Sequence, residues 1–158
     1  MRISLDLDNV LFVSPGQCET EPPRRFPVNR LFPELLRMGT VDLVHTLQDQ
    51  GFEVWLYTTS FRADVYIRTL FRHYGVRFDG IVNTGRHVTG GKRRSGEPLT
   101  QEKPPLSRIS LHVGDAGSVP PEARTSFFQA VDVSGQDDQW TQKIIAEAAR
   151  IRSLSQSA

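Results

Sequence analysis

The sequence predicts an α/β fold with three layers, in which helices cover both faces of a central parallel sheet. Short apolar runs typical of strands alternate with segments whose apolar residues recur at helical spacing, and this alternation indicates right-handed crossovers between parallel strands. The 158 residues, of which 38% are hydrophobic, suit one domain with one core. We therefore assign a single domain to residues 1–154 and a frayed tail to residues 155–158.

Short runs rich in β-branched, aliphatic and aromatic residues predict the strands of the sheet. The predicted strands are, in chain order, residues 2–7, Phe52–Tyr57, Phe78–Val82, Ile109–Val113 and Phe127–Val133. Several of these runs end directly at an acidic or hydroxyl residue. In open parallel sheets the ligand site lies at the carboxyl ends of the strands, so these polar residues are expected at one edge.

Apolar residues spaced three and four apart predict the helices. The predicted helices follow residues Val41–Leu47, Ala63–Tyr74 and Trp140–Ile151. Thr40 is the expected N-cap of the first helix, and Gly51 and Gly75 are expected to end the first and second. Asp137 or Asp138 is expected near the cap of the third.

Two segments lack a sustained period. Residues 13–39 are rich in Pro, Gly and Arg and predict an irregular loop with a short helix near Leu31–Leu36. Residues 84–105 predict a long polar loop, and loops of this length in compact domains are usually functional or disordered. The stretch 85–94 is the most basic local feature. It is interpreted either as a recognition loop for a phosphorylated protein or a nucleic-acid end, or as a solvated loop. Arg24 and Arg25 are likewise interpreted either as recognition residues or as solvated surface charges.

Overall charge and cysteine content exclude several classes. With 19 basic and 18 acidic residues the net charge is +1, which provides no global attraction to nucleic acid or to an anionic membrane. The single cysteine, Cys18, cannot form an internal disulfide and favours a reducing compartment. No apolar run is long enough to span a membrane, and Asp6 and Asp8 interrupt the region that a signal peptide would need. A cytoplasmic protein is therefore expected.

Asp6 and Asp8 are the most informative pair of residues. Residues two apart on a strand face the same side, so the two carboxylates are expected in one small site. Neighbouring carboxylates repel each other unless a cation or a shared proton compensates. The pair therefore favours a divalent metal or covalent chemistry, and the alternative is two solvated acids at a strand end.

Four motifs in order resemble the haloacid dehalogenase (HAD) superfamily of Mg²⁺-dependent phosphohydrolases. They are Asp6-Leu7-Asp8-Asn9-Val10, the strand ending in Thr58, a lysine in the long loop, and His112-Val113-Gly114-Asp115. A narrower resemblance, to small bacterial members, rests on Tyr57-Thr58-Thr59-Ser60, Lys103-Pro104-Pro105 and Leu111-His112-Val113. The resemblance implies a Rossmann-like (HAD-like) fold and a phosphomonoester hydrolase.

The resemblance also implies a role for each matched residue. Asp6 is the nucleophile that forms an aspartyl-phosphate, and Asp8 is the general acid and base. Thr58 donates its hydroxyl to a phosphoryl oxygen, and Lys103 neutralises the charge of the nucleophile and phosphate. The implied Mg²⁺ ligands are Asp6, the backbone carbonyl of Asp8, and Asp115. The implied substrate-binding residues are Thr59, Ser60 and Asn9.

Three of these assignments have alternatives. Thr58 is alternatively an ordinary hydroxyl that caps the next helix, and Thr59 or Ser60 would then donate to the phosphoryl oxygen instead. Asp115 is alternatively a turn residue. Lys92 is the alternative to Lys103, and a solvated loop lysine is the alternative to both. Lys103 is preferred because the prolines after it stiffen its approach.

The fourth motif departs from the family pattern, in which a second acid stands near Asp115. Gly114 precedes Asp115 here, and the residues that follow, Ala116-Gly117-Ser118-Val119, carry no acid. Asp132 and Asp137 are candidates to compensate. Loss of outer-shell support commonly weakens metal binding, so weak or strongly Mg²⁺-dependent activity is expected.

Family members insert cap domains after the first or second motif. Neither the stretch before residue 41 nor the loop after the third strand, about 25 and about 20 residues, can fold a core of its own. A capless, open site is therefore expected, acting on a phosphorylated small molecule or macromolecule. Two further readings stay open: a catalytically weak or inactive relative that binds a partner, and a phosphatase specialised for polynucleotides or proteins. A phosphotransferase or a dehalogenase is a weaker option, because dehalogenation leaves Asp8 unexplained.

Overall fold

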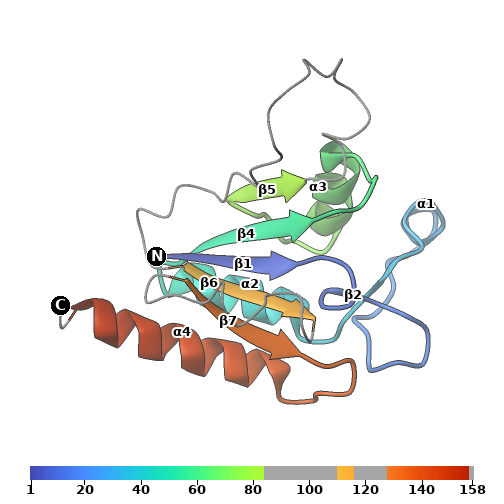
Figure 1. Ribbon diagram of the computed structural model, residues 1–158. Coiled ribbons are helices and arrows are strands. Elements are labelled where there is room, and N and C mark those ends of the chain that lie inside the picture. Colours follow the sequence, from blue (N-terminus) through green and yellow to red (C-terminus); the bar gives the residue numbers. More distant parts are fainter. Residues whose placement is uncertain (84–109, 116–127, 157–158) are drawn as a thin grey trace, which may run out of the picture.

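A five-stranded parallel sheet in the order β5-β4-β1-β6-β7 forms the centre of the molecule (Figure 1). The computed structural model describes residues 1–83, 110–115 and 128–156. The strands are β1 (Arg2–Asp6), β4 (Glu53–Thr58), β5 (Gly80–Asn83), β6 (Ser110–Asp115) and β7 (Phe128–Val133). The predicted α/β class with a mainly parallel, Rossmann-like sheet is confirmed.

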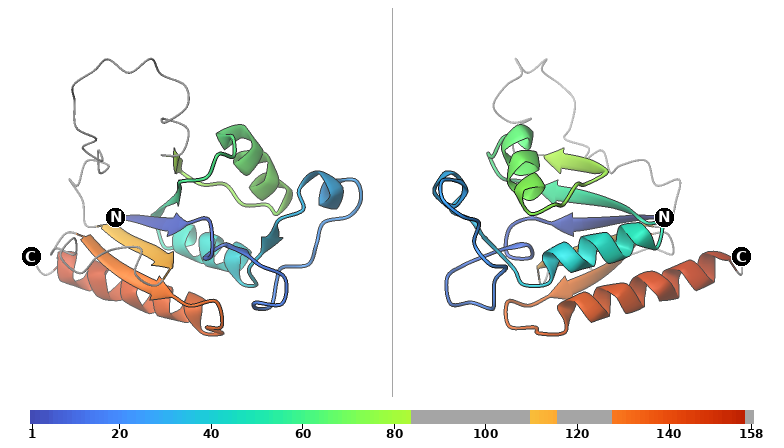
Figure 2. Two further views of the ribbon diagram at one scale, coloured as in Figure 1. Left: turned by 45° about the vertical axis from the view of Figure 1, so that its right-hand side comes forward. Right: turned by 180° about the vertical axis from the view of Figure 1, so that it is seen from behind.

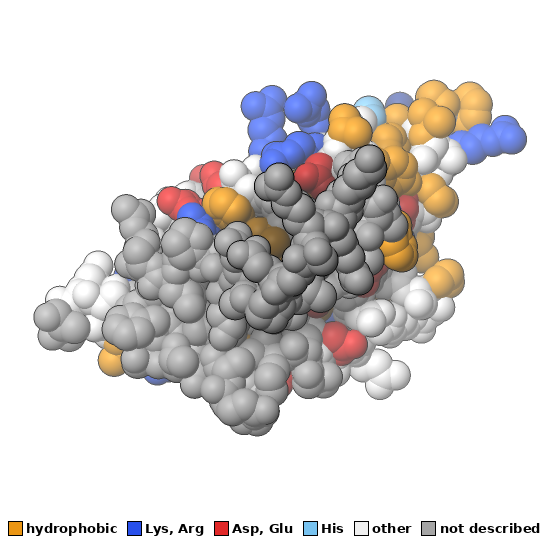
Figure 3. All heavy atoms as spheres, turned by 45° about the horizontal axis from the view of Figure 1, so that its top comes forward, with side chains coloured by type: hydrophobic (Ala, Val, Ile, Leu, Met, Phe, Trp, Pro, Cys, Tyr) orange, Lys and Arg blue, Asp and Glu red, His pale blue; other side chains and the backbone are white. Residues whose placement is uncertain are grey.

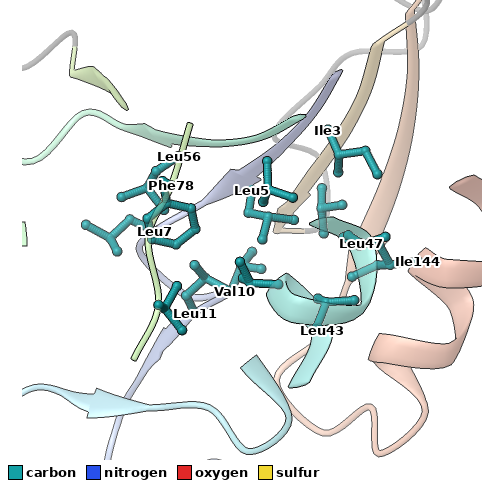
Figure 4. Packing of buried hydrophobic residues seen from close by; sticks show 14 of the residues in the cluster. Ile3, Leu5, Leu7, Val10, Leu11, Leu43, Leu47, Leu56, Phe78 and Ile144 are labelled. Atoms are coloured by element: carbon teal, nitrogen blue, oxygen red, sulfur yellow. The ribbon is translucent and has the colours of Figure 1, made fainter. Parts of the chain in front are cut away.

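Alternation along the strands separates the two faces of the sheet. Ile3 and Leu5 of β1 are fully buried, and so are Val54 and Leu56 of β4, whereas the residues between them are only partly buried. The buried side chains join those of the helices in one hydrophobic cluster. Figure 4 shows part of this cluster, in which residues of β1 meet Leu43 and Leu47. This is the pattern expected for a sheet with its core on one face.

Three helices contribute to that same cluster: α2 (Thr40–Asp49), α3 (Asp64–His73) and α4 (Trp140–Gln156). Their buried residues recur at helical spacing, and in the view from behind the helices lie in front of the sheet (Figure 2). The described helices therefore cover one face. None of these three helices covers the other face, so the second helical layer of the three-layer fold stays a prediction. The predicted loop 84–105 lies outside the described residues. No helix in the described part of the chain has the length and apolarity that crossing a bilayer requires.

The segment predicted as an irregular loop contains a small antiparallel hairpin. β2 (Phe12–Val13) pairs with β3 (Leu35–Leu36), and the four-residue helix α1 (Val28–Leu31) lies between them. The expected helix near Leu31–Leu36 is therefore wrong in place, because Leu35 and Leu36 are extended and Leu36 packs into the core. Phe12 and Leu36 of this segment belong to the same hydrophobic cluster as the strands and helices of the main sheet.

The N-cap of α2 is Gly39 and not Thr40. Gly39 has φ 87°, which a side chain would strain, and Thr40 is the first helical residue. The Thr40 hydroxyl instead donates to the carbonyl of Arg37 at 2.7 Å. The predicted helix ends are confirmed, since Gly51 and Gly75 follow α2 and α3 with positive φ.

Strand boundaries shift by one or two residues from the prediction, most clearly at β5. The pairing of β5 with β4 starts at Gly80, because Asp79 instead makes two other contacts with Val54. The Asp79 amide donates to the Val54 carbonyl at 2.9 Å, and the Asp79 carboxylate accepts from the Val54 amide at 2.7 Å. The apolar residue Phe78 consequently packs into the core ahead of the strand.

Arg37 joins the hairpin to the turn that precedes α4. The residue is 2% exposed, and Nη2 donates to the carbonyls of Ser134 at 2.8 Å and Asp137 at 3.0 Å. Its guanidinium lies 4.8 Å from the centre of the Trp140 ring. The Asp137 carboxylate accepts from the amide of Gln139 at 3.0 Å, which confirms the expected acid near the cap of α4.

Candidate active site

The polar residues predicted at the strand ends lie at one edge of the sheet. Asp6 ends β1, Thr58 ends β4 and Asp115 ends β6. β1 pairs with both β4 and β6 in parallel register, with Asp6 opposite Tyr57 and Leu5 opposite Val113. All three side chains are therefore brought to the carboxyl edge of the central strands, which is where a parallel sheet places its ligand site.

Asp6 is the most perturbed acid at this edge. Burial, together with smaller effects of the nearby carboxylates of Asp8 and Asp115, raises its pKa from the ordinary value of 3.8 to about 6. The amide of Leu7 donates to Asp6 Oδ1 at 2.9 Å and partly offsets this effect. The carboxylates are therefore close enough to repel one another, and a cation among them would relieve that repulsion.

The Asp8 carboxylate has a donor on each oxygen. Arg62 Nη1 donates to Oδ1 at 3.0 Å, and Thr58 Oγ1 donates to Oδ2 at 3.5 Å. The side chain of Asp8 keeps 44% of its surface exposed. The acid is therefore held by protein donors while it remains open to solvent.

Asn9 lies in a turn that carries the chain away from β1. It has φ 64°, a left-handed conformation that asparagine tolerates better than most residues. Leu11 and Phe12 donate their amides to the carbonyl of Leu7 at 3.2 and 2.8 Å and close the turn. The turn places Asn9 Nδ2 at 3.4 Å from Asp115 Oδ2, so Asn9 contacts the acid of the fourth motif.

Thr58 and its two successors differ in exposure. Thr58 is fully buried, Ser60 is partly buried and Thr59 is exposed. The amide of Ser60 donates to Thr58 Oγ1 at 3.0 Å. Thr58 does not cap α3, because the N-cap there is Ala63, which excludes the alternative reading of this hydroxyl. Ser60 Oγ is buried and makes no hydrogen bond among the described residues.

Sequence reasoning missed Arg62, Glu34 and Tyr66. Arg62 Nε donates to Glu34 Oε1 at 3.2 Å, and the hydroxyl of Tyr66 donates to Glu34 Oε2 at 2.7 Å. One sequence signal pointed to Arg62. A basic residue just before a helix N-terminus is unfavourable because of the helix dipole, unless a neighbouring acid compensates. Glu34 had no such signal, because it lies 28 residues earlier in the chain.

Exposed hydrophobic side chains lie near Arg62, Glu34 and Tyr66. They gather on the side that carries α1 and α3, beside Lys and Arg side chains (Figure 3). The exposed residues within these two helices include Leu31 and Val65, and Phe26 and Phe61 are exposed just before them. The hydroxyl of Tyr66 also lies 3.4 Å from the Leu31 carbonyl, so α1 packs near the start of α3.

The other residues singled out from the sequence are the lysines of the long loop, the basic stretch 85–94 and two arginines. Lys103 and Lys92 are outside the described residues, as is the basic stretch 85–94. Arg24 is not a free surface charge, because its guanidinium stacks 4.2 Å from the ring centre of Tyr74. Arg25 is exposed.

The two acids proposed to compensate for Gly114 have other neighbours. Asp137 binds Lys143 Nζ at 2.5 Å, so its carboxylate is engaged at the start of α4. Asp132 pairs with Gly114 across β6 and β7, and its charge acts on His112. His112 is buried, which lowers its pKa from 6.5 to about 4, and Ser4 Oγ lies 2.8 Å from its Nδ1.

No group of three or more His, Cys, Asp or Glu side chains within residues 1–83, 110–115 and 128–156 is arranged to hold a metal ion. The carboxylates of Asp6 and Asp115 lie at the ends of β1 and β6, close enough for Asp115 to affect the pKa of Asp6. These hard oxygen donors suit Mg²⁺, which commonly takes one or two carboxylates and completes its shell with water.

Comparison with known proteins finds similarity to solved structures. No protein-family model matches the chain, and no curated protein matches it. A chain in the solved "Structure of Pnkp1/Rnl/Hen1 complex" is similar at 17% identity and a TM-score of 0.46. The match covers 86% of this chain and 46% of that chain, so this chain spans less than half of its length. Likeness at this level establishes neither a shared family nor a shared function.

Proposed function

We propose that the protein is a phosphomonoester hydrolase of the HAD type that uses Asp6 as its nucleophile and depends on Mg²⁺. The observation that carries this proposal is the convergence of Asp6, Asp8 and Asp115 at one sheet edge, with the pKa of Asp6 raised by burial and by the other two acids. A fold gains no stability from such a cluster, because each buried charge is costly. Acids held together in this way are typical of catalytic sites.

The residues have complementary tasks in the proposed reaction. An oxygen of Asp6 attacks phosphorus while the bond to the leaving oxygen breaks, and Asp8 gives that oxygen a proton. Asp8 then takes a proton from the water that attacks the aspartyl-phosphate, which releases phosphate and restores Asp6. Thr58 and Lys103 stabilise the phosphoryl oxygens, and Thr59, Ser60 and Asn9 bind the substrate.

Asp6, Asp115 and the Asp8 carbonyl would hold the Mg²⁺. When bound, the ion supplies the positive charge that offsets repulsion between the carboxylates and the phosphate dianion. The partial exposure of Asp8 supports access for substrate from solvent. The substrate is a phosphorylated small molecule or macromolecule, and no membrane is involved.

Hydrolysis of p-nitrophenyl phosphate with and without Mg²⁺ tests the proposal. We expect turnover that requires Mg²⁺ and is abolished in Asp6→Asn. Asp49→Asn is the matched control, because Asp49 is an exposed acid at the end of α2, and this variant should retain full activity. A folded wild-type protein that hydrolyses none of a broad panel of phosphorylated metabolites, peptides and nucleic-acid ends would contradict the proposal.

A second candidate is a catalytically inactive relative that binds a partner. The observation that favours it is the thin acid support beside Asp115, where Gly114 stands and Asp137 is engaged with Lys143. Calorimetric titration with Mg²⁺ separates the candidates. Binding in the millimolar range or tighter supports the hydrolase, and no heat of binding at millimolar metal supports the inactive relative.

A further inference from the structure

Arg62 connects the site to the hairpin segment through a chain of charged contacts. Its Nη1 donates to Asp8 at 3.0 Å, and its Nε donates to Glu34 at 3.2 Å. Glu34 is 14% exposed and also accepts from the Tyr66 hydroxyl at 2.7 Å. Asp8, Arg62, Glu34 and Tyr66 therefore link the end of β1, the β4–α3 connection, the segment before β3 and α3.

The backbone of Arg62 is held as well. Asn83 at the end of β5 donates from Nδ2 to the carbonyl of Arg62 at 2.8 Å and to Asp64 Oδ1 at 3.2 Å. The guanidinium also lies 5.3 Å from the centre of the Phe12 ring. An arginine fixed at its backbone and at its charged end has little freedom to turn toward another partner, and its planar fork keeps the direction of each donor.

We propose that Arg62 is a positioning residue that fixes the direction of the Asp8 carboxylate for proton transfer to the leaving oxygen. This inference rests on the proposed function, in which Asp8 is the general acid. Asp8 is nearly half exposed, and an exposed carboxylate samples several rotamers unless a donor holds it. Arg62 holds Oδ1 at 3.0 Å and the Thr58 hydroxyl lies 3.5 Å from Oδ2, so protein donors on both oxygens set the direction of the carboxylate, with Arg62 the closer of the two.

Glu34 gives Arg62 its own anchor. Because Glu34 occupies Nε, the guanidinium shares its charge between two carboxylates. Tyr66 remains a hydrogen-bond donor to Glu34 over the working pH range, since burial and the contact with Glu34 raise its pKa to about 12. The anchor is therefore stable, and Arg62 acts through Asp8.

Two aryl substrates that differ in their leaving group test this role. p-Nitrophenolate departs without a proton, whereas phenolate from phenyl phosphate departs far more readily when an acid protonates it. In Arg62→Met we expect kcat on phenyl phosphate to fall about ten-fold more than kcat on p-nitrophenyl phosphate, with KM little changed on either. Arg62→Lys should recover part of the loss, and the exposed Arg68→Met on α3 is the matched control.

Glu34→Gln provides a second test that leaves Arg62 in place. It should show the same selective loss of kcat on phenyl phosphate, to a smaller extent. If circular dichroism shows that Arg62→Met is unfolded, the result for Glu34→Gln tests the inference instead. Equal losses on both substrates, or a rise confined to KM, would overturn the inference while the proposed function stands. A wild-type protein that hydrolyses neither substrate would overturn both.

Discussion

Replacing Asp6 by asparagine should make the metal-free protein more stable while it removes activity. Asparagine keeps an oxygen that can accept from the Leu7 amide, as Asp6 Oδ1 does at 2.9 Å. It removes the charge that burial and the acids Asp8 and Asp115 make unfavourable. Asp6→Asn should therefore raise stability and lower activity through the same carboxylate, because the repulsion that destabilises the fold is the feature proposed to serve catalysis.

The pKa of Asp6 sets the size of this effect. The difference between about 6 in the folded protein and the ordinary 3.8 corresponds to about 3 kcal/mol at most. Asp6 is only partly buried, so solvent screening reduces the expected gain to about 1–2 kcal/mol.

The sign of the pH dependence follows from the raised pKa. A folded-state pKa above the unfolded value means that the folded state binds the proton more tightly. The penalty is absent below about pH 4, grows between pH 4 and 6, and is complete above pH 6. The stability advantage of Asp6→Asn should therefore shrink as the pH is lowered through this window.

Urea unfolding in EDTA between pH 4.5 and 8 measures this advantage. Asp49→Asn, an exposed acid at the end of α2, should show little change at any pH. Added Mg²⁺ should stabilise the wild type and not Asp6→Asn, because only the wild type keeps the full ligand set. An Asp6→Asn variant that is less stable than wild type, or whose advantage is the same at every pH, would refute the reasoning.

Two further predictions concern the scaffold. Arg37→Met should lower the free energy of unfolding by about 2–4 kcal/mol, since it removes a buried guanidinium that binds the carbonyls of Ser134 and Asp137. The exposed Arg30→Met should stay within about 0.5 kcal/mol, and equal losses in urea melts would contradict this. Burial lowers the pKa of His112 to about 4, so the contribution of His112 to stability is full above pH 6.5 and falls toward pH 4, by up to about 3 kcal/mol, against the opposite effect of Asp6. In His112→Asn, which keeps a polar atom toward Ser4, this decline should be smaller, and parallel pH profiles of the two proteins would disprove it.

The sequence was sufficient for the elements with strong local patterns. The apolar runs of β1 and β4 and the helical spacing of Leu43, Val44 and Leu47 predicted two strands of the sheet and the buried face of α2. It failed where the pattern is short, as in the hairpin β2–β3. Each strand there has two residues, too few for a period of two to be read, and their extended form depends on pairing with each other.

The candidate site divides in the same way. The sequence by itself determined that Asp6, Thr58 and Asp115 follow apolar strands, and in a parallel sheet that is enough to bring them to one edge. Only the tertiary structure decided that Arg62 and Glu34 join Asp8, and that Asn9 meets Asp115. The physical reason is that strand alternation is a property of adjacent residues. These contacts instead depend on the order of the strands and on where the hairpin segment returns, which no local pattern encodes.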